Sequence, residues 1–149
     1  MSVFPAKVLL AIDGSEEAAL AAQAATELSE ETGSEVHLTF VLPAPKDLIG
    51  HHTYSAEVRE SVLEQARSEA RTFVEGRAEQ LRAEGAKVAQ VHLRIGEPDK
   101  EIIRLSEEIG ATLIVMGSRG LGAVSRALMG SVSDSVVRHA HCPVLVMRH

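Results

Sequence analysis

The chain has 149 residues, of which 45% are hydrophobic and 24% are charged, and these are the proportions of a globular domain able to bury a substantial core. Its net charge of −6 excludes general nucleic-acid binding and attraction to an anionic membrane, because both need a basic surface. No apolar run approaches the ~20 residues of a membrane-spanning helix, the N-terminus lacks a signal-peptide pattern, and the single cysteine, Cys142, fits a reducing compartment. We therefore expect one cytoplasmic domain over residues 1–149.

The first half of the chain alternates short apolar runs with longer amphipathic segments. We predict strands at Lys7–Ile12 and Glu35–Leu42, and between them a helix over Glu16–Thr32 that follows a Ser15 cap and ends at Gly33. The segment Pro43–Ser55 has turn residues and no period, which predicts a loop. A long helix over Ala56–Glu84 is then predicted from apolar positions near 3.6-residue spacing: Val58, Val62, Ala66, Ala70, Phe73, Val74, Ala78 and Leu81.

The second half continues the alternation. We predict a strand at Lys87–Ile95, a helix that starts at Pro98 and stops before Gly110, and a strand at Thr112–Met116. A helix from about Ser131 to His139 and a last strand at Pro143–Met147 complete the pattern. Five apolar strands alternating with helices predict an α/β fold with a parallel sheet that is covered on both faces.

A glycine-rich loop follows the fourth predicted strand. The strand ends at Gly117, three glycines follow at Gly120, Gly122 and Gly130, and Ser131 and Ser133 then open a helix. This layout presents backbone N–H groups to a phosphate. Two common nucleotide motifs do not fit. The Walker A pattern is excluded because Ala123 and Val124 stand where Lys and Ser/Thr are required, and the dinucleotide fingerprint fails because Ser125 replaces its third glycine.

The spacing Gly117-x2-Gly120-x9-Gly130-Ser131 resembles the signature of the ATP-binding branch of the universal stress protein family. The resemblance covers nearly the whole chain and includes Asp13-Gly14-Ser15, Gly96-Glu97-Pro98, Val115-Met116-Gly117 and the closing segment His141–Val146. It implies a single open, Rossmann-like five-stranded parallel sheet of order 3-2-1-4-5 with helices on both faces. Strands one and four are then neighbours where the winding reverses, and ligands of open α/β sheets bind at such a switch point.

The resemblance also implies a set of nucleotide contacts. Asp13 and the main chain of Val41 would frame the adenine and ribose, and Met116 and Gly117 would line the nucleotide. The ribose and phosphates would be held by four further residues and by the Val132 N–H group: Gly120, Gly130, Ser131 and Ser133. From the residues alone, Arg119 and Arg126 are the only cations in the loop, and either could pair with the phosphates, although Arg126 could equally face water.

These residues lead to the hypothesis of a stress-response protein that binds an adenine nucleotide, ATP with or without Mg²⁺, and acts as a ligand-dependent regulatory module. A slow ATPase or phosphotransferase using the same pocket and a nucleotide-independent interaction protein stay open as alternatives. No catalytic set is visible, and Asp13 alone is thin support for hydrolysis. The clusters His51-His52 and His139-x-His141-Cys142 lack a recognisable fourth metal ligand.

The last predicted strand suggests how the protein assembles. Pro143–Met147 is almost entirely apolar, and by the resemblance it lies at an edge of the sheet, where an uncovered apolar strand invites pairing. We expect a homodimer in which two such edges meet about a two-fold axis. The alternative is a monomer in which the loop Pro43–Ser55 or a helix covers this edge.

Overall fold

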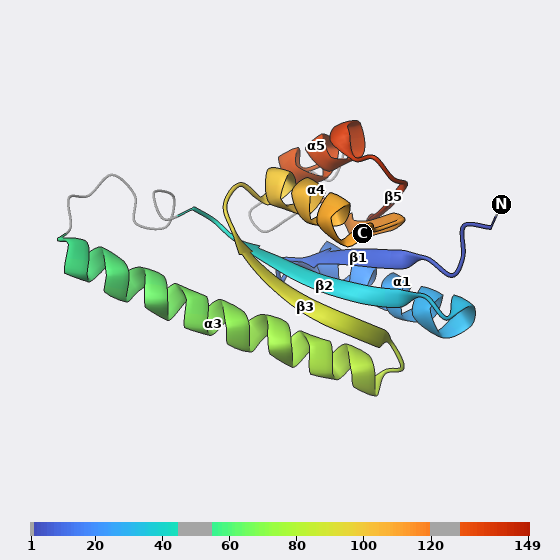
Figure 1. Ribbon diagram of the computed structural model, residues 1–149, viewed down its shortest axis with the longest axis horizontal. Coiled ribbons are helices and arrows are strands. Elements are labelled where there is room, and N and C mark those ends of the chain that lie inside the picture. The colour runs from blue at the N-terminus through green and yellow to red at the C-terminus, as the bar shows by residue number, and fades with distance from the viewer. Residues whose placement is uncertain (1, 45–54, 120–128) are drawn as a thin grey trace.

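The computed structural model describes residues 2–44, 55–119 and 129–149. Its centre is a parallel sheet in the order β3-β2-β1-β4-β5 (Figure 1), as predicted. The strands are β1 (Lys7–Ile12), β2 (Glu35–Leu42), β3 (Lys87–Ile95), β4 (Leu113–Gly117) and β5 (Val144–Met147). The helices are α1 (Glu16–Thr32), α3 (Ala56–Ala83), α4 (Pro98–Ile109) and α5 (Ser131–His139).

Three predicted elements have boundaries displaced by one residue, among them the last strand, which begins at Val144 rather than Pro143. The fourth strand begins at Leu113 rather than Thr112 and ends at Gly117 rather than Met116. The Thr112 side chain instead bonds to the first residue of β1: its hydroxyl oxygen accepts a hydrogen bond from Lys7 N–H at 2.9 Å. The long helix ends at Ala83 rather than Glu84, which becomes its C-cap. None of these shifts moves a side chain to the other face of the sheet.

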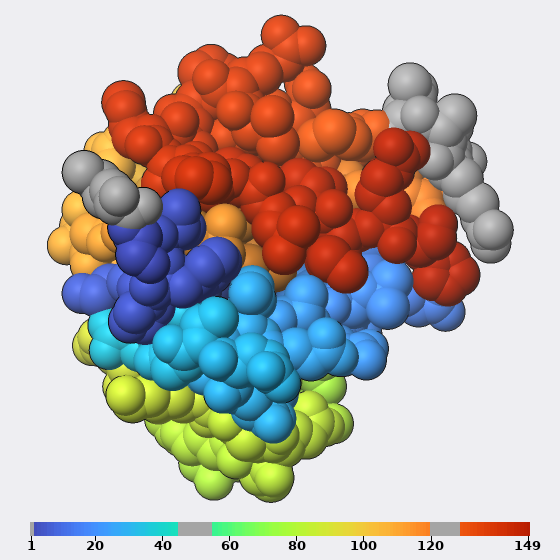
Figure 2. Space-filling view, turned by 90° about the vertical axis from the view of Figure 1, so that its right-hand side faces the viewer, coloured from blue at the N-terminus to red at the C-terminus, as the bar shows by residue number. Residues whose placement is uncertain are grey.

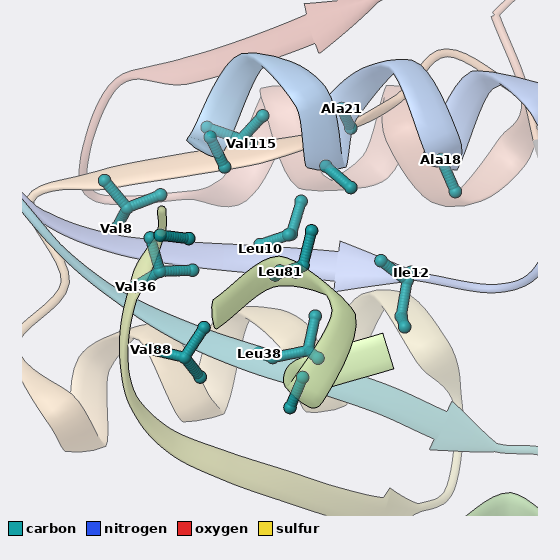
Figure 3. Close-up of a cluster of buried hydrophobic side chains, with 14 of the residues drawn as sticks. Val8, Leu10, Ile12, Ala18, Ala21, Val36, Leu38, Leu81, Val88 and Val115 are labelled. Atoms are coloured by element: carbon teal, nitrogen blue, oxygen red, sulfur yellow. The ribbon is translucent and has the colours of Figure 1, made fainter. Parts of the chain in front are cut away.

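The sheet separates two apolar layers, because successive side chains of a strand point to opposite faces. On one face, Val8, Leu10 and Ile12 pack with α1 and α3 in the larger cluster (Figure 3). On the other face, Leu9 and Ala11 pack with α4 and α5. The five side chains are buried, and full burial of each large aliphatic one stabilises the fold by about 1.5–3 kcal/mol.

Helix α3 departs from the expected packing in its first half. Val58 and Val62 belong to the predicted apolar stripe, yet they are 43% and 41% exposed, and the buried positions of the helix begin at Ala70. The reason is length: a helix of 28 residues spans ~42 Å, whereas the 9-residue strand β3 spans ~30 Å. The amino-terminal end of α3 therefore extends past the sheet (Figure 1). None of the helices in the described ranges is long and apolar enough to cross a membrane.

Candidate functional site

A cavity of about 340 Å³ lies at the carboxyl ends of β1 and β4, the point at which the winding of the sheet reverses. Its size falls within the range of about 300–1,000 Å³ typical of small-molecule sites. The lining residues come from widely separated parts of the chain: Ala11, Ile12, Asp13, Ser15, Ala18, Thr39, Val41, Pro98, Ile102, Met116, Gly117, Ser118, Arg119, Gly130, Ser131, Val132 and Ser133.

This lining includes every predicted contact residue that the structure describes. Asp13, Val41, Met116, Gly117, Arg119, Gly130, Ser131, Val132 and Ser133 all border the cavity. Gly120, Gly122 and Arg126 lie outside the described residues, as do His51 and His52. Residues separated by more than 100 positions in the sequence thus converge on one place.

The turn after β1 fixes Asp13 at the wall of the cavity. Asp13 Oδ1 accepts a hydrogen bond from Ser15 N–H at 2.9 Å, and Gly14 adopts a positive φ of 87° that permits this tight turn. The helix cap is Ser15, whose hydroxyl accepts from Ala18 N–H at 3.1 Å. Ser15 is thus the cap of α1, as predicted, and the Asp13 carboxylate is held beside the cavity.

Gly117 is required by packing at the end of β4. A Cβ atom there would lie 2.7 Å from the carbonyl carbon of Glu17 and 2.9 Å from Ala18 N, distances that real side chains do not tolerate. The glycine therefore lets the first turn of α1 approach the strand end, which brings the Asp13 turn and β4 to opposite sides of the cavity.

Ser118 is a hydrogen-bond centre that the sequence analysis missed. Its N–H donates to Met147 O at 2.8 Å, and its carbonyl accepts from Gly130 N–H at 2.6 Å and from the Ser133 hydroxyl. The residue ties β4, β5 and the start of α5 together. The only signal in the sequence was a small polar residue directly after the strand-ending glycine.

These bonds engage polar groups of two residues, Gly130 and Ser133, that are expected to hold the ribose and phosphates. Gly130 is the N-cap with φ −67°, so it does not need the positive φ that only glycine adopts easily, and its N–H is already engaged by Ser118. The Ser133 hydroxyl also donates within the protein, to Ser118 O and to Gly130 O. Ser131, in contrast, is exposed and borders the cavity. It lies in the first turn of α5, where the backbone N–H groups have no partner within the helix. A phosphate could therefore be met by the N–H groups of Ser131 and Val132 and by the Ser131 hydroxyl.

The positive charge of Arg119 is paired with a carboxylate. Its Nη2 donates to Glu17 Oε1 at 2.6 Å, and its carbonyl oxygen accepts from the Ser15 hydroxyl at 3.4 Å. The backbone N–H of Glu17 and, against the opposing effect of burial, the Arg119 guanidinium hold the pKa of the Glu17 carboxyl below its usual range. The N-terminal turn of α1 thus holds Arg119 through both its main chain and its side chain.

The opposite wall of the cavity is apolar. Ala11, Val41 and Met116 from the strands and Pro98 and Ile102 from α4 face the space. Pro98 occupies the first turn of α4 after the Gly96-Glu97 turn, whose Gly96 N–H donates to Leu42 O at 3.0 Å. Pro98 and Ile102 escaped the sequence analysis because their motif marks a helix start and says nothing of what the helix covers.

The described histidines form no metal centre. No group of three or more His, Cys, Asp or Glu side chains in the described ranges could hold a metal ion. His139 Nδ1 lies 2.8 Å from Ser135 O, and His141 Nε2 lies 3.0 Å from Glu107 Oε1. Burial raises the pKa of the Cys142 thiol, which makes that thiol less nucleophilic.

Comparison with known proteins agrees with this architecture. Residues 6–148 match the model of the Universal stress protein family. A putative universal stress protein of Staphylococcus haemolyticus is 37% identical over 145 residues, which cover 95% of this chain and 83% of that protein. The solved structure of universal stress protein UspA from Lactobacillus plantarum shares the fold with a TM-score of 0.81 at 23% identity, covering 96% of this chain and 97% of that one.

A second solved structure was determined with a ligand. It is the universal stress protein from Archaeoglobus fulgidus in complex with dAMP, with a TM-score of 0.65 at 23% identity, covering 96% of this chain and 98% of that one. The family match extends over almost all of the sequence, and the strand order and the switch-point cavity agree with it. This chain belongs to the universal stress protein family.

Proposed function

We propose that this protein binds an adenine nucleotide, ATP in the first instance, in the cavity between β1 and β4, and that the bound nucleotide regulates its interactions during stress. The observation that carries the proposal is the convergence at the switch point of Asp13, the end of β4 and the start of α5 around one cavity. The residues match the spacing expected of the ATP-binding branch, of which Gly120 lies outside the described ranges.

The two ends of the cavity suit the two ends of a nucleotide. A purine can pack against the apolar wall of Val41, Ile102 and Pro98, while the ribose hydroxyls reach the Asp13 carboxylate. The phosphates then meet the start of α5, where backbone N–H groups and the Ser131 hydroxyl are donors without charge. The A. fulgidus protein in complex with dAMP supports an adenine ligand for this cavity.

A regulatory role fits the chemistry better than efficient hydrolysis. Asp13 is the one acidic residue among the described lining residues. One of its carboxylate oxygens already accepts a hydrogen bond from Ser15 N–H. Phosphoryl transfer needs a group that positions water and, in most enzymes, carboxylates for Mg²⁺. A slow ATPase therefore remains the second candidate, with Asp13 as the residue on which turnover would depend.

Two parts of the hypothesis concern the protein beyond this cavity. We propose that the 149 residues act as one nucleotide-binding unit in the cytoplasm, and that two copies pair through β5. That strand forms one edge of the sheet, and Figure 2 shows the C-terminal segment in red at the surface beside α1.

Nucleotide release and calorimetry test the function. Denaturing the purified protein should release an adenine nucleotide that chromatography identifies, and titration of nucleotide-free protein with ATP should give saturable binding at one site. Gly130→Val, which places a branched side chain at the wall of the cavity, should abolish ATP binding while the protein stays folded, because its φ of −67° is accessible to valine. A folded Gly130→Val protein with unchanged ATP affinity would refute the proposed site.

A further inference from the structure

Arg119, the one cation among the described residues that line the cavity, is paired with a carboxylate. Arg119 lines the cavity and its guanidinium donates to Glu17. The two side chains are 13% and 10% exposed, so salt in the solvent screens the pair much less than it screens surface charges. The charge of Glu17 therefore compensates that of the Arg119 guanidinium at the wall of the cavity.

The structure holds this pair in place from several sides. Glu17 lies in the first turn of α1, whose backbone packs against Gly117 so closely that a Cβ atom there would clash. Ser15 caps the same helix and donates to the Arg119 carbonyl. Since α1 fixes both partners, the ion pair is part of the wall of the cavity rather than a chance contact of two long side chains.

The charge balance at the cavity follows from this arrangement. Among the described residues, the Asp13 carboxylate and the Arg119 guanidinium line the cavity. The Glu17 carboxylate is paired with Arg119, so two negative charges accompany one positive charge there. Arginine has five N–H donors, so a ligand oxygen can still bond to Arg119 while Glu17 is in place. Each added phosphate nevertheless meets a guanidinium whose charge Glu17 already compensates.

We propose that Glu17 determines which adenine nucleotide the cavity prefers, because it competes with ligand phosphates for the Arg119 guanidinium and so reduces the gain in affinity from each added phosphate. This inference rests on the proposed function and names a residue outside the predicted set of contacts. Glu17 acts through Arg119 and is a positioning residue, whereas Arg119 contacts the ligand.

The test is the ratio of the affinity for ATP to the affinity for adenosine, measured by calorimetry at one fixed Mg²⁺ concentration. The affinity for AMP, which has a single phosphate, is measured in the same way and should be intermediate. Glu17→Gln keeps the shape and a hydrogen-bond acceptor for Arg119 but removes the charge. We expect the ratio to rise about threefold to tenfold, the effect of one partly screened charge, with adenosine affinity little changed. Glu16→Gln is the matched control, because it removes the same charge one residue earlier, from a side chain that is 81% exposed, and it should leave the ratio unchanged.

A double-mutant cycle tests whether the effect passes through Arg119. Arg119→Gln should lower the ratio, and adding Glu17→Gln to it should change the ratio less than about twofold. The double variant also removes both members of the buried pair, which leaves no uncompensated charge if Glu17→Gln alone folds poorly. An unchanged ratio in folded Glu17→Gln, an equal gain with and without Arg119, or an equal gain in Glu16→Gln would overturn the inference. If the wild-type protein binds none of the three ligands, the proposed function fails instead.

Discussion

At the scale of single residues, Gly117 and Gly130 of the glycine-rich pattern differ in their physical roles. Gly117 has no room for a side chain because the backbone of α1 lies against it. Gly130 has an ordinary extended conformation, and its N–H closes a hydrogen bond to Ser118. One glycine of the motif thus maintains the fold that shapes the cavity, while the other borders the space that a ligand would enter.

Replacement of Gly117 should therefore change stability. We expect Gly117→Ala to reduce the free energy of unfolding by about 1–3 kcal/mol, because the new methyl group is forced against the backbone of Glu17 and Ala18. Gly76→Ala is the control: Gly76 lies inside α3 with open space around it, and the change should stabilise the protein by about 0.5–1 kcal/mol. Urea denaturation measures both, and a neutral Gly117→Ala would contradict the packing argument.

The two serines at the start of α5 should separate ligand binding from stability. Ser131 is exposed at the cavity, so Ser131→Ala should cost about 0.5–1.5 kcal/mol of ATP binding, a severalfold loss, with adenosine affinity and stability little changed. Ser133 donates to two carbonyl groups within the protein, so Ser133→Ala should instead lower the free energy of unfolding by about 1 kcal/mol. Calorimetry and thermal melting measure the two effects. Equal weakening of ATP and adenosine by Ser131→Ala would show that its hydroxyl does not reach the phosphates.

At the scale of elements, β2 and β3 are joined by a polar cluster that faces away from α3. His37 Nδ1 lies 3.2 Å from His92 Nε2 with the rings stacked, and His37 Nε2 lies 3.3 Å from Glu35 Oε1. Arg94 and Glu108 form an ion pair beside them. Burial first, and then the charges of His37 and Arg94, lower the pKa of His92, with Glu108 acting in the opposite direction.

This lowered pKa makes stability depend on pH. The unfolded chain takes up a proton at His92 near the ordinary pKa of 6.5, whereas the folded protein takes it up only at lower pH. The stabilisation is therefore complete above about pH 6.5 and is lost as the pH falls below it. The pKa of Glu35 is lowered chiefly by its bond to His37, so Glu35 keeps its contribution to stability until the pH falls below the ordinary carboxyl pKa of 4.5.

We expect His92→Gln to lose less stability than the wild-type protein between pH 7.5 and 5.5, as measured by urea denaturation at each pH. His141→Gln, which changes an exposed histidine that pairs with Glu107 outside the cluster, should keep the wild-type dependence. The same slope in all three proteins would show that His92 is not responsible.

Local patterns predicted most elements but could not show what each element covers. The α1 boundaries followed from Ser15 and Gly33, and those of α4 from Pro98 and Gly110, because caps and helix-ending glycines act within a few residues. The exposure of Val58 and Val62 depends on the length of α3 relative to β3, and the Glu17–Arg119 pair joins residues 102 positions apart. Periodicity and motif spacing contain neither of these long-range relations.

At the scale of the whole molecule, the edge strand β5 is the candidate surface for pairing with a second copy of the chain. Among the described residues, this strand pairs with β4 on one side and with no other strand. Val144 and Val146 pack against the cluster with α4 and α5, and Met147 packs against the larger cluster, while Leu145 is 37% exposed. Val137 on α5 is exposed as well. An edge strand with free backbone groups and an exposed leucine can pair with a second copy and bury both.

The exposure pattern decides which substitution tests the homodimer. Val146→Lys would put a charge against the apolar cluster with α4 and α5 and threaten the fold. Leu145→Lys places the charge at the exposed position instead, so it should give a folded monomer that binds ATP with wild-type affinity, because the cavity lies at β1 and β4. Sedimentation at micromolar concentration distinguishes the two states. A wild-type protein that sediments as a monomer, or a Leu145→Lys protein that stays dimeric, would show that copies of this chain do not pair through β5.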